Sequence, residues 1–207
     1  HAGPEIGVAS TKAFTSQVTV LAMIALLLGR QRRLSFEAGS DIVKAMQELP
    51  ELVEQTLKLS DQIAGIANKY VKANNFLYLG RHFNYPVAME GALKLKEISY
   101  IHCEAYPAGE LKHGTISLIE KGTPVIAVCL REDVFAKTLS AVKEVKARGA
   151  EVIVLTREDF RSSFEENDKV ITVKYPCSDA LSLIIGAVSL QLLSYHIAVK
   201  RGCEVDK

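Results

Sequence analysis

From residue 76 to the C-terminus, short apolar segments alternate with helical patterns, and this alternation restricts the possible fold more than any other feature. The apolar segments are FLYLG from Phe76, PVIAVCL from Pro124, EVIVLT from Glu151 and KVITVKY from Lys169. They are apolar on both faces, which is typical of strands that lie buried between two layers of helices. The sequence therefore predicts an α/β fold with three layers (αβα), in which helices cover both faces of a parallel sheet.

Three helical patterns accompany these strands. They are YPVAMEGALKLKEISYIH, with Pro86 in its first turn, VFAKTLSAVKEVKARG, with Gly149 as its C-cap, and ALSLIIGAVSLQLLSYHIAVKRG. Parallel sheets of this kind bind ligands at the carboxyl ends of their strands. We therefore expect a ligand site in the loops that follow the strand at Phe76 and precede the strand at Pro124.

The first 75 residues show only helical patterns. Ser10 and Thr11 precede KAFTSQVTVLAMIALLLGRQRR, which predicts an N-capped helix, although free N–H groups at a helix start also attract anions or sugar hydroxyls. The longest apolar run, VTVLAMIALLLG from Val18, is shorter than the roughly 18 residues that a membrane-spanning helix needs. We therefore predict a buried helix with a basic C-terminal end, and no membrane contact.

Two further helices are predicted before the sheet begins. Gly39 and Ser40 interrupt the pattern, and DIVKAMQEL then predicts a second helix that ends before Pro50. The following segment has apolar residues at helical spacing and predicts a third helix that extends to about Lys72.

Composition and charge indicate a globular chain without nucleic-acid-binding character. Of the 207 residues, 48% are hydrophobic and 24% are charged, and the formal net charge is +1. Basic and acidic residues are interspersed, so nucleic acid is not an expected partner. The N-terminal sequence predicts no signal peptide, and a start at His1 in place of Met predicts a processed or excised chain.

The cysteines predict neither a disulfide framework nor a metal site. Cys103, Cys129, Cys177 and Cys203 form no CxxC pair and no zinc-ligand spacing. A reducing cytoplasmic location is the simplest inference for such a chain.

The segment EGALKLKEISYIHCEAYPAGELKHG, residues 90–114, concentrates charged side chains and histidines. On a helix, Glu90, Lys94 and Glu97 lie within roughly 60° of one another. This pattern is typical of an exposed salt-bridge ladder, and it also suits an acid–base pair, because helical spacing does not separate the two. Lys96 points away from this stripe, and we expect its side chain to be exposed.

The histidines allow two interpretations. His113 lies between Gly109 and Gly114, which predicts a loop. A loop histidine can approach a ligand and transfer protons near neutral pH, but a single one more often stabilises its own turn. We interpret His102, at a predicted helix end, and His196, in the last helix, as structural.

Three segments together resemble the isomerase half of the glucosamine-6-phosphate synthases, the glutamine–fructose-6-phosphate aminotransferases of hexosamine synthesis. They are EIGVASTKAFT, EGALKLKEISYIHCEAYPAGELKHG and QLLSYHIAVKRGCEVDK. The resemblance extends over the whole chain and implies the sugar isomerase (SIS) fold, with its flavodoxin-like strand order. It implies that residues 1–35 end a first SIS domain, that residues 36–66 are a helical linker, and that residues 67–207 form the second SIS domain.

The same resemblance implies roles for individual residues. Glu97 would be the base that moves a proton between C1 and C2 of the open-chain sugar, with Lys94 next to the substrate oxygen. His113 would assist ring opening in the site of a neighbouring subunit, which implies a homodimer. Substrate-binding positions are implied at Val8, Ser10 and Glu90, and Glu90 would alternatively hold Lys94 in place.

The implied reaction converts fructose 6-phosphate and glutamine-derived ammonia to glucosamine 6-phosphate, with neither a metal nor an organic cofactor. The family's glutaminase domain, the phosphate-binding loops of its first SIS domain and its Schiff-base lysine lie outside these 207 residues. We therefore expect this segment to be inactive, or nearly so, by itself.

Two other functions remain compatible with the sequence. Another SIS enzyme, a phosphosugar isomerase or deaminase, would share the sheet and Glu97 but would need no glutaminase partner. A non-catalytic sugar-phosphate sensor would have no need of Lys94, Glu97 and His113 together, and would usually carry a DNA-binding segment.

Overall fold

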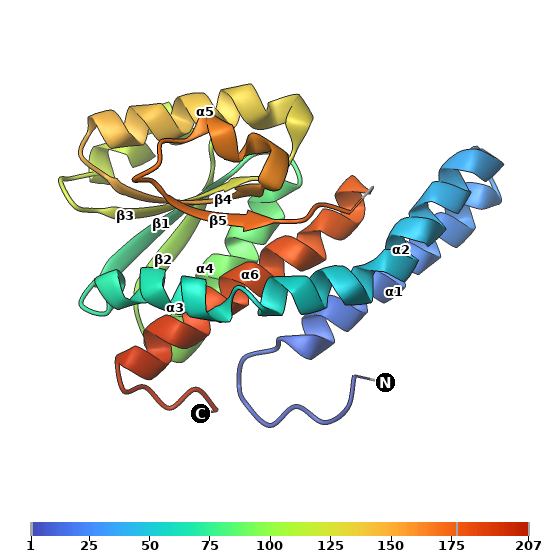
Figure 1. Cartoon of the computed structure of the whole chain (residues 1–207), viewed down its shortest axis with the longest axis horizontal. Helices are drawn as coiled ribbons and strands as arrows, with labels where there is room; N and C mark the ends of the chain where they lie inside the picture. The colour runs from blue at the N-terminus through green and yellow to red at the C-terminus, as the bar shows by residue number, and fades with distance from the viewer. Residues whose placement is uncertain (1, 177, 207) are drawn as a thin grey trace.

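A five-stranded parallel sheet forms the centre of the molecule. The computed structural model describes residues 2–176 and 178–206 (Figure 1). The strands are β1 (Asn75–Gly80), β2 (His102–Pro107), β3 (Pro124–Cys129), β4 (Glu151–Arg157) and β5 (Lys169–Val173). They lie in the order β2-β1-β3-β4-β5, and every neighbouring pair is parallel. The predicted parallel sheet and its flavodoxin-like order are confirmed.

Helices cover both faces of the sheet, as predicted. They are α4 (Asn84–Ser99), α5 (Glu132–Ala147) and α6 (Asp179–Lys200). Helices α4 and α6 lie on one face and α5 lies on the other (Figure 1). Successive residues of a strand point to opposite faces, so Phe76 and Tyr78 join the core under α4 and α6, while Leu77 and Leu79 join the core under α5.

The edge strand β2 was not expected from the sequence. The helical pattern predicts that the helix continues to His102, and this is wrong, because α4 ends at Ser99. Tyr100 adopts the left-handed conformation, with φ of 59°, and this conformation closes the helix. His102 then begins β2, where it pairs with Asn75 of β1.

Three short 3₁₀ helices complete the connections between strands. Leu111–His113 and Thr115–Leu118 lie between β2 and β3, and Glu158–Ser163 lies between β4 and β5. The expected loop around His113 is therefore present, and Gly114 occupies a backbone conformation, with φ of 137°, that favours glycine.

The N-terminal part is helical, but its helix boundaries differ from those predicted. The helices are α1 (Lys12–Arg30), α2 (Phe36–Leu57) and α3 (Ser60–Ala67), followed by a 3₁₀ turn at Asn68–Tyr70. Gly39 does not break a helix but lies inside α2, where an added Cβ would come within 2.7 Å of Arg30 Cδ on α1. Pro50 does not end α2 either, because burial of Ala45, Leu49 and Thr56 holds the helix on both sides of it.

Helix α1 is not buried, contrary to the prediction. Val18 and Ala22 pack against the core, but none of the residues of α1 is fully buried. Its outer side exposes large apolar residues, among them Val20, Leu21, Met23, Ile24, Leu27 and Leu28. The prediction failed because no other part of the described chain covers this side of the helix.

Two helical segments of the described residues are long and apolar enough to cross a membrane by length and composition alone, Lys12–Arg30 and Leu181–Lys200. In the second segment, 67% of the apolar window is buried inside the fold. Its hydropathy is therefore that of a core helix. The first segment is α1, whose exposed apolar side is described above.

Two close helix–helix contacts place α4 against α6. A Cβ at Gly91 of α4 would clash with the Leu190 side chain and would lie 2.9 Å from a ring carbon of Tyr78. A Cβ at Gly186 of α6 would lie 2.8 Å from Val87 Cγ1. Glycine at these two positions lets the helices approach more closely than any larger residue would allow.

We predict that Gly91→Ala lowers the free energy of unfolding by about 1–3 kcal/mol, because the added methyl group overpacks the α4–α6 contact. The matched control is Gly65→Ala in α3, where a Cβ would meet nothing within 4 Å. This control should raise the free energy of unfolding by about 0.5–1 kcal/mol. Urea denaturation of both variants measures the difference, and equal effects at the two positions would contradict the close packing.

Candidate active site

The ion cluster predicted on the charged helix is present, and it is buried. Lys94 Nζ donates a hydrogen bond to Glu97 Oε2 at 2.7 Å and lies 3.6 Å from Glu90 Oε1. The side chains of Lys94 and Glu90 are only 4% and 9% exposed. The interpretation as an exposed salt-bridge ladder is therefore wrong. Lys96, by contrast, lies exposed, as expected.

Burial makes the three charges interdependent. An ammonium in a protein interior is tolerated only when anionic partners replace the water that it loses. Burial raises the pKa of the Glu90 carboxyl, Lys94 lowers it, and the Glu97 carboxylate raises it again. One ammonium thus faces two carboxylates, and the cluster carries net negative charge when both are ionised.

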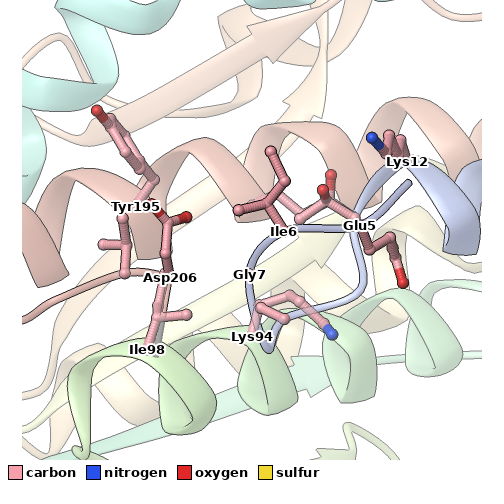
Figure 2. A pocket seen from close by; sticks show the side chains of 12 residues that line it. Glu5, Ile6, Gly7, Lys12, Lys94, Ile98, Tyr195 and Asp206 are labelled. Atoms are coloured by element: carbon pink, nitrogen blue, oxygen red, sulfur yellow. The ribbon is translucent and has the colours of Figure 1, made fainter. Parts of the chain in front are cut away.

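A cavity of about 280 Å³ opens beside Lys94 (Figure 2). Its walls come from the N-terminal segment, α4, α6 and the C-terminal residues Val205 and Asp206. Figure 2 shows Lys94 rising from α4 toward the loop that carries Gly7, with Tyr195 and Asp206 on the other side. The volume is near the lower end of the range for small-molecule sites.

The cavity lies away from the loops at which the sequence predicted a site. None of its lining residues comes from the loops after β1 or before β3. Lys94 and Ile98 belong to the second half of α4, which runs back along the sheet from the carboxyl end of β1. The helix therefore carries the charged residues away from that edge.

The two residues predicted in the N-terminal segment, Val8 and Ser10, do not line the cavity, although their neighbours do. Gly7 and Ala9 line it, whereas Val8 between them is mostly exposed. Ser10 Oγ donates a hydrogen bond to Glu5 Oε1 at 3.2 Å. The predicted N-capping is not found, because Thr11 occupies the N-cap position without a side-chain hydrogen bond.

Glu97 and His113 are placed differently with respect to this cavity. Glu97 does not line it, but its side chain is 27% exposed and is bonded to Lys94, which does. His113 is exposed on its loop, and its nearest ionic partner is Glu110, with Nε2 at 4.0 Å from Oε2. Within the described chain, His113 makes no contact with Lys94 or Glu97.

His102 and His196, interpreted as structural from the sequence, have structural surroundings. His102 is exposed at the start of β2, 3.6 Å from Glu104. His196 Nε2 lies 2.8 Å from Ser60 Oγ of α3, and burial lowers the pKa of His196. Neither histidine lines the cavity.

Two of the three described cysteines are poor nucleophiles. Cys103, Cys129 and Cys203 are free, and burial raises the pKa values of Cys103 and Cys129 to about 12. Cys177 lies outside the described residues. Among the residues that are described, no three His, Cys, Asp or Glu side chains converge as a metal site would require.

Sequence reasoning missed the contribution of the last helix and the C-terminus to the cavity. Gln191 and Tyr195 line it from α6, and Asp206 lines it from the C-terminal segment. The signal was present in SLQLLSYH, where polar and aromatic residues interrupt an apolar core helix. Lys12 also lines the cavity, from the first turn of α1.

The arrangement suits proton transfer on a bound polar molecule. A carboxylate hydrogen-bonded to an ammonium, at the edge of a small cavity, can accept a proton while the ammonium stabilises a developing oxyanion. Comparison with known proteins identifies the family. Residues 69–201 match the family model described as the SIS domain. The chain belongs to the SIS domain family.

Relatives of this SIS domain chain include glutamine–fructose-6-phosphate aminotransferases (isomerizing). The protein from Chlorobaculum tepidum is 48% identical over 207 residues, and the protein from Bacteroides thetaiotaomicron is 46% identical over 215 residues. Each match covers the whole of this chain and 34% of the relative. The chain thus spans about a third of the length of the curated relatives it matches.

A solved structure supports the same assignment. The C-terminal domain of the glucosamine-fructose-6-phosphate aminotransferase from Francisella tularensis superposes with a TM-score of 0.95 and 40% sequence identity. The match covers 99% of this chain and 58% of that chain. The predicted SIS fold is therefore confirmed, together with the resemblance to the isomerase region of these enzymes.

We predict that Lys94→Met lowers the free energy of unfolding by about 3–5 kcal/mol at pH 8, because it leaves two carboxylates without their buried partner. The loss should be smaller at pH 5. Glu90 already has a raised pKa, and without Lys94 it stays protonated, and therefore uncharged, to a higher pH.

Urea denaturation at pH 5 and pH 8 measures this difference, with Lys96→Met as the control. Lys96 is exposed on the same helix, so its replacement should change the free energy of unfolding by no more than about 0.5 kcal/mol. A loss for Lys94→Met that is equal at both pH values would contradict the buried cluster.

Proposed function

We propose that this chain is the isomerase part of an enzyme that converts fructose 6-phosphate and glutamine-derived ammonia to glucosamine 6-phosphate. The single observation that carries the proposal is the buried Lys94, bonded to Glu97 and opening onto a cavity. The names of the relatives that match over the whole chain at 46% and 48% identity supply the reaction.

Glu97 would act as the base. It would remove a proton from one of the two carbons C1 and C2 and return it to the other, on one face of a planar enediol-type intermediate. Lys94 would keep Glu97 ionised and stabilise the negative charge that develops on the neighbouring oxygen. Glu90 would support Lys94 or contact the sugar, and the backbone near Val8 and Ser10 would contact its hydroxyls.

His113 would act in the site of a second subunit. The His113 side chain is exposed, and its nearest described ionic partner is Glu110. An exposed imidazole in this position can reach another copy of the chain. The proposed functional unit is therefore a homodimer, in which this imidazole assists opening of the sugar ring.

The rest of the proposed enzyme would lie outside these 207 residues. Residues 1–35 would belong to a first SIS domain, residues 36–66 would form a linker, and residues 67–207 would form the second SIS domain. The exposed apolar side of α1 supports this division, because a helix that ends another domain would bury that side there. A glutaminase domain would supply ammonia, and the whole protein would work in the cytoplasm without a metal or an organic cofactor.

The competing functions have weaker support. A phosphosugar isomerase or deaminase would share Glu97, but the relatives that are 46% and 48% identical over the whole chain carry the name of the aminotransferase. A sensor without catalysis would not need a lysine buried between two carboxylates beside a cavity.

The test uses a chimera in which these 207 residues replace the matching third of the Chlorobaculum tepidum relative. We expect the chimera to form glucosamine 6-phosphate from fructose 6-phosphate and glutamine. Glu97→Gln should lower kcat by about 10²–10⁴-fold, because the amide cannot accept the proton. Glu120→Gln, an exposed glutamate outside the cavity, is the control and should leave kcat unchanged.

The 207-residue chain alone should give no measurable turnover in the same assay. A folded chimera without activity would refute the proposed function. Full activity of Glu97→Gln would refute the role of Glu97, and turnover by the 207-residue chain alone would refute its dependence on the other domains.

A further inference from the structure

A second cavity lies beside the first and shares its polar wall. It has a volume of about 470 Å³ between α1, α4 and α6, and apart from Glu90 and Lys96 its lining is apolar. Lys94 and Gln191 line the first cavity, and Glu90 lines the second. Three polar side chains from two helices therefore separate the two spaces.

Two buried atoms in this wall lack a hydrogen-bond partner. They are Glu90 Oε1, an acceptor, and Gln191 Nε2, a donor. The Gln191 amide lies close enough to Glu90 to lower the pKa of its carboxyl, but a hydrogen bond of normal geometry is not formed. A buried donor and a buried acceptor on neighbouring side chains are most simply satisfied by a small rotation that joins them.

We propose that Gln191 is a positioning residue for proton transfer: its carboxamide holds the Glu90 carboxylate against Lys94 and so keeps the ammonium shared between Glu90 and Glu97. The close α4–α6 contact at Gly91 sets the distance between the Gln191 and Glu90 side chains. Gly91 lies next to Glu90 in the sequence and packs against Leu190, the neighbour of Gln191. For its catalytic consequence, this inference rests on the proposed function.

Sharing matters because the single positive charge of Lys94 faces two carboxylates, those of Glu90 and Glu97. When Glu90 is an anion, it draws part of the ammonium's attraction away from Glu97. When Glu90 is protonated and therefore neutral, the Lys94 ammonium forms an ion pair with Glu97 alone. A neutral donor at residue 191 favours the first state, because it stabilises the Glu90 anion without adding charge.

The charged groups around this wall are few. Lys94 and Glu97 lie on α4 with Glu90, and Lys96 lies at the second cavity. The first cavity adds Lys12, Glu5 and Asp206. From α1, the second cavity is lined only by Phe14 and Val18. Within the described residues, Gln191 is the polar group that α6 presents to Glu90.

The direct test follows the Glu90 side-chain carboxyl carbon by ¹³C NMR as a function of pH in the 207-residue chain. Gln191→Met keeps the length of the side chain and removes the donor. It should raise the midpoint of the Glu90 titration by about 0.5–1 pH unit. Gln191→Glu puts a second carboxylate beside Glu90 and should raise the midpoint further.

Gln62→Met is the matched control, because the Gln62 amide donates to Val170 O at the edge of the sheet and does not line either cavity. It should leave the Glu90 midpoint unchanged. An unchanged midpoint in Gln191→Met and Gln191→Glu would overturn the inference, as would an equal rise in Gln62→Met.

Kinetics of the chimera separate this inference from the proposed function. If wild-type chimera is active, Gln191→Met should lower kcat by about 10-fold with little change in KM for fructose 6-phosphate, because positioning acts on the chemical step. Unchanged kcat with a shifted midpoint would overturn the catalytic part of the inference. If wild-type chimera is inactive, the proposed function fails, and the NMR titration still decides whether Gln191 holds Glu90.

Discussion

The burial of one ammonium group determines what this molecule can do. Charged side chains rarely enter a protein interior unless partners replace the water that they lose. Lys94 does so because α4 supplies Glu90 one turn before it and Glu97 one turn after it. The carboxylates that make its burial tolerable are also groups that can exchange protons, so the residues that hold the structure here are the ones to which we assign the proposed chemistry.

The position of this cluster follows from the packing of α4. One side of the helix meets the sheet, and another meets α6 through Gly91 and Gly186. The N-terminal segment and the C-terminal residues then close a cavity over Lys94 (Figure 2). Segments that are nearly 200 residues apart in the chain therefore meet at one site, and Figure 1 shows both termini on the same side of the molecule. Each of these contacts depends on the others.

The sequence predicts the sheet well because strands that are apolar on both faces have few alternatives, and the four segments from Phe76 onward all form strands. It misses β2, whose polar residues suit an edge strand and resemble a helix end. It places the Glu90–Lys94–Glu97 stripe correctly on one helix, but its burial depends on α6 and on the N-terminal segment, which helical spacing does not encode. For the same reason Gln191 was overlooked, and α1 was expected to be buried by contacts that the described chain does not contain.

The most direct measurement is a crystal structure of the chimera with glucosamine 6-phosphate bound. Our account predicts that C1 and C2 of the sugar lie within about 3–3.5 Å of the Glu97 carboxylate and that Lys94 contacts the adjacent oxygen. A sugar bound instead at the carboxyl ends of β1 and β3, with Glu97 in contact only with Lys94, would contradict it.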